Sequence, residues 1–322
     1  MTAFLVQRLL QAAVVMLAIS VLVFVGVFAI GNPIDVLIAP DATQQIREET
    51  IARYGFDQPL WRQYLSFIER LLSGDLGRSF VFNLPVLDLI LSRLPATLEL
   101  TLVAVIGATL IGVPLGMYAG YRPDHWFSRL AMGISVLGFS VPTFWIGLVL
   151  IFAFAVSLGW LPAGGRGDTL AWLGTEWSVL TANGWQHLLL PALNLSLFKM
   201  AMMMRLARSG TRELMMSDTV RFARAAGESD WTILRHHVLR LIAIPIVTVF
   251  GLELGSTLAF AVVTETIFSW PGVGKLIIDS IQSLDRPVMV AYLMLVALLF
   301  ILINLVVDLV YALLDPRLRG RS

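Results

Sequence analysis

Six long apolar stretches constrain this chain more than any other feature of its sequence. They cover residues 9–30, 96–120, 130–158, 188–206, 241–263 and 288–314. About 20 apolar residues allow a helix to cross the hydrocarbon core of a bilayer. Only 14% of the 322 residues are charged, whereas soluble domains carry about 25%. The pattern predicts an all-α integral membrane protein with six transmembrane helices.

The basic residues predict how these spans are oriented. Most arginines fall at the ends of the chain and in the segments on one side: Arg8, Arg122, Arg129, Arg208, Arg212, Arg221, Arg224, Arg235, Arg240, Arg317, Arg319 and Arg321. The short loops 159–187 and 264–287 on the other side hold only Arg166, Lys275 and Arg286. Because short loops rich in Lys and Arg stay in the cytoplasm, we expect both termini to be cytoplasmic.

The chain divides into four parts on these features. Residues 1–30 form an N-terminal segment with the first transmembrane helix, and residues 31–95 an outer, periplasmic helical subdomain. Residues 96–314 form a five-helix core, and residues 315–322 a cytoplasmic tail. The outer subdomain is predicted from two helical segments, 44–53 and 60–72, the second with apolar residues at helical spacing.

A polar segment, residues 207–240, separates the fourth and fifth spans. Ser217 or Asp218 is suited to cap a short helix, because both side chains accept hydrogen bonds from unpaired backbone N–H groups. Gly227 stands where a helix ends in the left-handed conformation, and Ser229 is suited to cap a second helix. A period of 3.6 residues places four apolar residues of that second helix on one face: Trp231, Leu234, Val238 and Leu241.

The polar segment is predicted to dock a soluble partner. It is rich in arginine, and its small Ala223, Ala225 and Ala226 let another surface approach closely. The alternative is an amphipathic helix that lies on anionic lipid and is held there by Arg and Trp.

Motifs along the whole chain carry a resemblance to a known family. They are YGFDQPL (54–60), GDLGRS (74–79), RLPATLEL (93–100), RFARAAG (221–227) with Pro245 eighteen residues on, TETIFSWPGVG (264–274) and DPRLR (315–319). Together they resemble the permease subunits of ATP-binding-cassette importers, in the branch for dipeptides, oligopeptides and nickel. Two positions depart from the family's patterns: Arg221-Phe222 replaces Glu-Ala of the general coupling motif, and Asn32 replaces an Asp after the first span.

The resemblance implies a set of partners in the bacterial inner membrane. These are a second homologous permease, two cytoplasmic ATP-binding subunits, an extracytoplasmic substrate-binding protein and the lipid bilayer. The polar segment would be the coupling segment that seats on an ATPase, through Asp218, Arg221, Ala223, Arg224, Ala226, Gly227, Glu228 and Ser229. The implied cargo is di- or oligopeptides, with nickel complexes, glutathione or a sugar as alternatives.

The region between the fifth and sixth spans caps the outer end of the pathway in the resembling family. Its residues Glu265, Trp270, Pro271, Gly272 and Gly274 are therefore candidates for an outer gate. The alternative is a structural turn in which glycine permits close backbone approach.

The sequence offers no catalytic set. The nearest approach to a phosphate-binding loop is Gly274-Lys275, and Leu276 follows where that loop needs Ser or Thr. We therefore expect ATP and magnesium in the partner ATPases, and no cofactor, metal or nucleic acid on this chain. Cysteine is absent and the histidines lack metal-ligand spacing.

Glu253 is the charge nearest the middle of a span, where an uncompensated carboxylate costs at least a few kcal/mol. It either lines the pathway and contacts a cationic part of the cargo, or is protonated or paired with Lys199 or a partner subunit. The competing function is a secondary transporter, which predicts inverted repeats with ionisable groups at the midplane. We find no repeat between the two halves.

Overall fold

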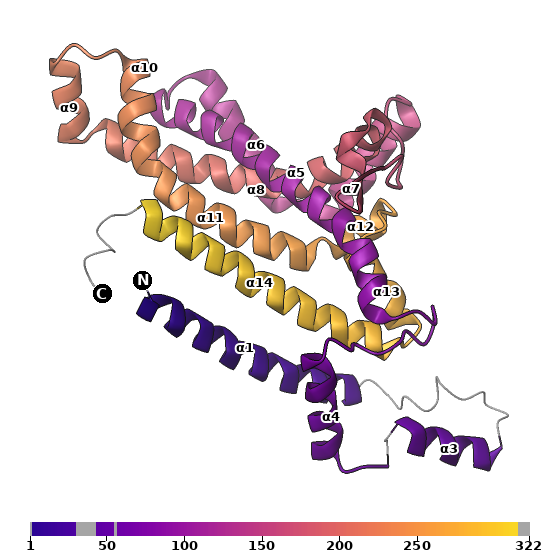
Figure 1. The fold of residues 1–322 in the computed structure, drawn as a ribbon. Helices are drawn as coiled ribbons and strands as arrows, with labels where there is room; N and C mark the ends of the chain where they lie inside the picture. Colours follow the sequence, from indigo (N-terminus) through magenta and orange to yellow (C-terminus); the bar gives the residue numbers. More distant parts are fainter. Residues whose placement is uncertain (1, 30–42, 55–56, 315–322) are drawn as a thin grey trace.

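The computed structural model describes residues 2–29, 43–54 and 57–314, and helices dominate it (Figure 1). The long helices are α1 (Thr2–Ala29), α5 (Val86–Tyr121), α8 (Ala182–Met215), α11 (Leu239–Phe260) and α14 (Arg286–Leu314). The shorter α-helices are α3 (Gln44–Tyr54), α4 (Leu60–Leu72), α6 (Trp126–Ser140), α7 (Thr143–Leu150), α9 (Asp218–Ala225), α10 (Asp230–Thr232), α12 (Val262–Ile267) and α13 (Val273–Gln282). Two π-helices, η1 (Ile151–Ser157) and η3 (Ile233–Val238), a 3-10 turn η2 (Ser178–Leu180), and the antiparallel strands β1 (Leu170–Trp172) and β2 (Thr175–Trp177) complete the described elements.

Five helical stretches in the described part of the chain are long and apolar enough to cross a membrane. They are Val6–Gly26, Val86–Tyr121, Ala182–Met215, Asp230–Phe260 and Arg286–Val307. A helix of 34 residues such as α8 is about 51 Å long, whereas the hydrocarbon core is about 30 Å thick. Helices α5 and α8 contain the predicted spans 96–120 and 188–206 and continue beyond them, so each is longer than a bilayer crossing requires.

The third predicted span, 130–158, is not one continuous helix. Helix α6 ends at Ser140 and α7 begins at Thr143, so Val141 and Pro142 separate them. Proline has no N–H to donate to the preceding turn, and it disfavours the helical conformation of the residue before it. Pro142 therefore divides the span into α6 and the shorter apolar helix Thr143–Ser157.

Helices α5 and α8 form the centre of the molecule and pack with almost no space between their backbones. A Cβ atom on Gly116 would lie 2.2 Å from the Met204 carbonyl oxygen, and one on Gly120 would lie 2.6 Å from that of Arg208. Such distances are far below van der Waals contact, so only glycine fits at these positions. Gly112, Gly116 and Gly120, four residues apart, therefore form the surface of α5 that packs on α8.

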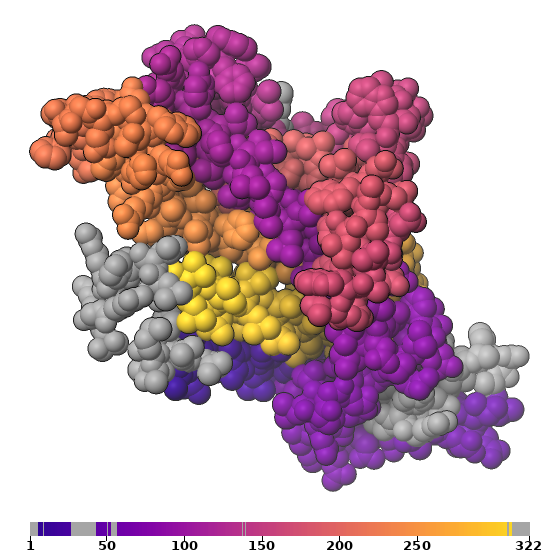
Figure 2. Space-filling model, turned by 45° about the horizontal axis from the view of Figure 1, so that its top comes forward, coloured from indigo at the N-terminus to yellow at the C-terminus, as the bar shows by residue number. Residues whose placement is uncertain are grey.

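The other elements surround this pair in a definite order (Figure 1). Helices α11, α14 and α1 form successive layers on one side, while α6 and α7 diverge on the opposite side. Figure 2 shows a hollow between the arm containing α6 and the arm containing α7 and the strands. Helices α9 and α10 lie at the same end as Thr2 of α1 and Leu314 of α14, and we call this the α9 end; α13 and α4 lie at the other.

The two predicted outer helices, 44–53 and 60–72, are confirmed as α3 and α4. Helix α4 packs on α1, where the Tyr64 and Ser20 hydroxyl oxygens are 2.8 Å apart and the Tyr64 ring meets Phe24 edge-on. Asn32 and the motif at 315–319 lie outside the described residues.

Candidate functional site

The polar segment begins with a capped helix that ends at Gly227. Ser217, and not Asp218, is the N-cap of α9, because its side chain accepts from the Val220 N–H. At the other end Gly227 has a φ of 83°. The Gly227 and Glu228 N–H groups donate to the Arg224 and Ala223 carbonyls at 3.0 and 3.1 Å, which is the Schellman arrangement. The predicted left-handed Gly227 is confirmed.

The second half of the segment begins with the predicted Ser229 cap. The Ser229 hydroxyl accepts from the Thr232 N–H at 3.2 Å, and Asp230 follows as the first residue of α10. Asp230 also joins the segment to the end of α5, because it accepts from the Tyr121 hydroxyl at 2.6 Å. Two contacts within the segment hold its halves together: Asp230 pairs with Arg224 at 3.5 Å, and His237 contacts Glu228 at 2.9 Å.

The predicted apolar face of the second helix is correct at Val238, which is buried, and at Leu234, which packs against the same core cluster. It is wrong at Trp231 and Leu241, which are 71% and 50% exposed, whereas Ile233 and Ile242 are buried. The π-helix η3 is the reason. Its wider turn, with hydrogen bonds from i to i+5, brings Ile233 and Val238, five positions apart, onto one face where we assumed a period of 3.6.

The surface of the polar segment is aromatic and basic, with small residues between. Ala223 is only 2% exposed, so it packs inward and does not offer the close approach that we expected of it. Ala225 and Ala226 are exposed, as are Arg221 and Arg224. Phe222 is 77% exposed beside them, a feature that the sequence analysis did not single out. Large apolar side chains exposed on a firmly held surface are typical of a protein–protein contact.

At the opposite end of the molecule, the motif 264–274 folds around one buried carboxylate. Glu265 is fully buried and accepts from the Thr97 hydroxyl at 2.6 Å and from the Lys275 N–H at 2.8 Å. A Cβ atom on Gly272 or Gly274 would lie 2.3 or 2.8 Å from its carboxylate oxygens. Burial raises the pKa of Glu265, and the hydrogen bonds from Thr97 and Lys275 oppose that rise. The motif therefore joins α12 and α13 to α5 through Glu265.

Trp270 completes this connection. Its side chain is fully buried, and the indole N–H donates to the Ala96 carbonyl at 2.8 Å. Pro271 is partly buried next to it. In this structure Trp270 is a packing residue and presents no surface to an outer partner.

Comparison with known proteins decides the family. The profile of the binding-protein-dependent transport system inner membrane component matches residues 112–320, and that of its N-terminal part matches residues 1–101. The chain belongs to this permease family. The resemblance drawn from the sequence motifs is confirmed.

Relatives of this permease are similar over their whole length. It is 39% identical over 318 residues to the glutathione transport system permease protein GsiC of Escherichia coli K12, and the aligned region covers 98% of each chain. It is 37% identical over 332 residues to the dipeptide transport system permease protein DppB of Alkalihalophilus pseudofirmus, covering 99% of this chain and 100% of that protein. A chain of the MetNI methionine ABC transporter, 17% identical, shares its fold with a TM-score of 0.56 over 72% of this chain and 98% of that one.

Two of the ion pairs away from the polar segment are largely buried. Lys199 Nζ is 2.7 Å from a carboxylate oxygen of Glu253, and the two side chains are 11% and 14% exposed. Glu99, almost fully buried, binds Arg166 Nε at 2.6 Å and also accepts from the Ser178 N–H and hydroxyl. The first pair was one of the alternatives drawn from the sequence. The second was missed, because 67 residues separate Glu99 from Arg166.

The described part of the permease contains no group of three or more His, Cys, Asp or Glu placed to hold a metal ion.

Proposed function

We propose that this chain is one of two permease subunits of an ATP-driven importer of di- or oligopeptides that a binding protein delivers. The choice of cargo is supported by the relatives GsiC and DppB, which are named for glutathione and dipeptide transport. Glutathione is itself a short peptide, so it is the second candidate.

The single observation that carries the coupling role is the exposed surface of a tightly bonded polar segment. Caps at Ser217 and Ser229 and the ties of Asp230 hold the segment in place. Phe222 and Trp231 nevertheless remain exposed. We propose that the ATPase seats on these two rings, on Arg221 and on the Ala225–Ala226 surface. Asp218, Gly227 and Glu228 would shape the segment, because they act through its internal bonds.

We further propose six membrane crossings with both termini in the cytoplasm. The five long helices supply five crossings, and α6 with α7 and η1 supplies the sixth in two pieces. The start of α1, the end of α14 and the polar segment lie together at the α9 end (Figure 1). The polar segment is rich in arginine, so the positive-inside rule supports a cytoplasmic location for this end.

The second permease would pack against the arms that border the hollow of Figure 2. Large apolar side chains are exposed on both arms, among them Leu130, Ile134, Trp145 and Phe152. Covering them would turn the hollow into a pathway between two chains. ATP and magnesium would act in the two cytoplasmic subunits, whose closure moves the polar segment.

The candidate outer-gate residues are proposed to close this pathway by holding helices together. Glu265, Gly272 and Gly274 join α12–α13 to α5, and Trp270 inserts beside Ala96. For Glu253 we propose the structural role, since the Lys199 ammonium already neutralises it.

The test uses the complete importer in proteoliposomes, with ATP inside and the binding protein outside. We expect Phe222→Ala with Trp231→Ala to leave assembly of the permease pair intact and to abolish both uptake of labelled dialanine and the ATPase stimulation by binding protein. Trp61→Ala is the matched control, because Trp61 is 60% exposed but lies on α4, away from the polar segment and from both arms (Figure 1). Full coupling in the double variant would refute the docking role, and uptake without the ATPases would favour a secondary transporter.

A further inference from the structure

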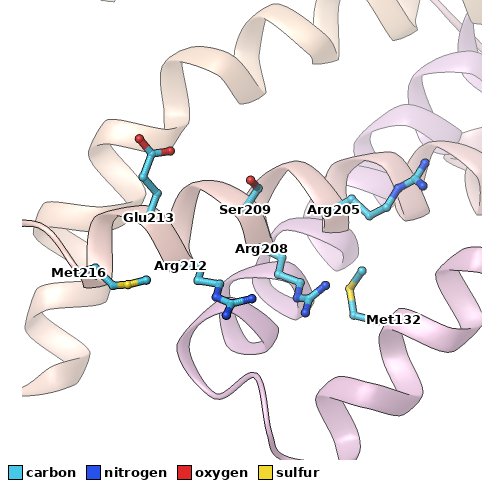
Figure 3. Close-up of a pocket in the computed structure, with 7 residues that line it drawn as sticks. All are labelled: Met132, Arg205, Arg208, Ser209, Arg212, Glu213 and Met216. Carbon is cyan, nitrogen blue, oxygen red and sulfur yellow. The ribbon is translucent and has the colours of Figure 1, made fainter.

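Three arginines of α8 lie beside a cavity near the α9 end. The cavity has a volume of about 420 Å³ and is lined by Met132, Arg205, Arg208, Ser209, Arg212, Glu213 and Met216. Figure 3 shows that Arg208 and Arg212 project from one side of α8 toward Met132 of α6, while Glu213 points to the other side. The cavity falls within the ~300–1,000 Å³ range of small-molecule sites.

The helical spacing concentrates positive charge on this side. At 100° per residue, Arg205, Arg208 and Arg212 fall within about 60° of one another around the helix axis. The lining holds three arginines and one glutamate, a net charge of two positive. Within the described chain, neither Arg208 nor Arg212 has a carboxylate partner, whereas Glu99 and Glu253 are already paired.

The charges on the exposed face of α8 at this level favour contact with water over contact with lipid acyl chains. Arg205, Ser209, Arg212 and Glu213 are all exposed there. Charged side chains of membrane-spanning helices face a water-filled cavity or pair with one another, because hydrocarbon does not solvate them. The side of α8 that carries α6 is also the side of the hollow that we assign to the pathway (Figure 2).

We propose that this cavity binds a carboxylate group of the cargo at the inner end of the pathway. The inference rests on the proposed function, because peptides carry a terminal carboxylate whatever their side chains. The planar guanidinium presents paired N–H donors that match the two oxygens of a carboxylate. Arg208 and Arg212 supply these donors, Arg205 adds positive charge, and Met132 and Met216 form adaptable apolar walls that accept varied side chains.

The site explains how one permease can serve cargo of differing sequence. It recognises the terminal charge that all such peptides share and makes no demand on the rest of the molecule. A positively charged inner mouth also attracts an anionic group that is already inside the pathway.

The experiment uses the absence of cysteine from this chain. Ser209→Cys places one thiol of this chain at the cavity, in the complete importer without nucleotide in phosphatidylcholine nanodiscs. An anionic and a cationic methanethiosulfonate reagent are compared, with labelling read by intact mass. We expect the anionic reagent to react faster, and Arg208→Gln with Arg212→Gln to lower the anionic-to-cationic rate ratio at least about tenfold, because two nearby charges are removed.

Cargo is then tested as a protecting ligand. Dialanine should slow labelling of the Ser209→Cys importer, and dialaninamide, which lacks the carboxylate, should not. The matched control is Arg235→Gln with Arg240→Gln, two exposed arginines that do not line the cavity; it should preserve both the ratio and the protection. These controls separate the cavity from a general loss of positive charge.

Each other outcome overturns the inference. Equal protection by dialanine and dialaninamide would show that the carboxylate is not recognised. Protection by inorganic phosphate alone would assign a different anion. Loss of anionic preference and of dialanine protection in nanodiscs containing phosphatidylglycerol would assign the cavity to a lipid headgroup. ATP-dependent uptake of dialanine by the unmodified importer tests the proposed function separately, so the two failures are distinguishable.

Discussion

The Lys199–Glu253 pair allows a quantitative test of how this permease tolerates charge inside its spans. At 2.7 Å and an effective dielectric constant of about 20, the attraction between the two charges is about 6 kcal/mol. Desolvation of both groups offsets most of this, so the pair adds little stability over two neutral groups. Removing one partner is different, because the remaining charge stays buried without compensation.

The magnitude follows from what remains around each charge. Removing one member of a buried pair costs about 3–5 kcal/mol. We expect the lower end, about 3 kcal/mol, for Lys199→Met, because the Ser256 hydroxyl remains 3.4 Å from Glu253 and both side chains keep some exposure. Glu253→Gln should cost a similar amount. The double variant removes both charges and should cost only about 1 kcal/mol.

The assay is a double-mutant cycle in which unfolding of the purified permease pair in mild detergent is monitored by circular dichroism. If each single variant lowers the free energy of unfolding by about 3 kcal/mol and the double variant lowers it by about 1 kcal/mol, the coupling energy is about 5 kcal/mol. Additive single effects would refute the reasoning. A change of cargo preference in Glu253→Gln but not in Lys199→Met would restore the pathway role of Glu253.

Three other contacts give predictions of their own. Gly116→Ala should destabilise the permease by about 1–3 kcal/mol through overpacking against α8, whereas Gly107→Ala, with no atom within 4 Å of the new Cβ, should be neutral or stabilising in the same thermal scan. Burial raises the pKa of Glu265 in the folded state, so the folded state holds the carboxyl proton more tightly than the unfolded state does. The free energy of unfolding should therefore fall as the pH rises from the ordinary glutamate pKa toward the raised pKa of the folded state. Glu265→Gln should flatten the plot of Tm against pH over this range, and an unchanged slope would show that Glu265 is not the titrating group. Glu99→Gln should free Arg166 and speed tryptic cleavage after it from the outer side of vesicles; equal cleavage rates would show that the pair does not anchor this loop.

Local features of the polar segment were predictable from the sequence because they depend on adjacent residues. A Ser cap needs only the next turn of backbone, and the left-handed Gly227 needs only the helix before it. Helices α3 and α4 were predicted for the same reason, since composition and spacing over about a dozen residues determine them.

Other features could not be read from the sequence because they depend on distant residues or on irregular turns. The Glu265–Thr97 hydrogen bond joins residues 168 positions apart, and no local sequence pattern predicts it. The π-turn of η3 changed which side chains of the second helix are buried, because it places Ile233 on the buried face together with Val238. A period of 3.6 residues, assumed throughout, contains no signal for such an insertion.

The contact between α5 and α8 at Gly116 and Gly120 limits where this permease can change shape. Because the Met204 and Arg208 carbonyls of α8 lie directly against these glycines, the contact has no soft layer that could yield, and α5 and α8 should move together there. Flexing is expected instead where the helical hydrogen bonds are interrupted, as between α6 and α7 at Val141–Pro142 and between α11 and α12. Displacement of the polar segment would therefore reach the outer face undiminished through α8, while the arm formed by α7 swings about its own joint.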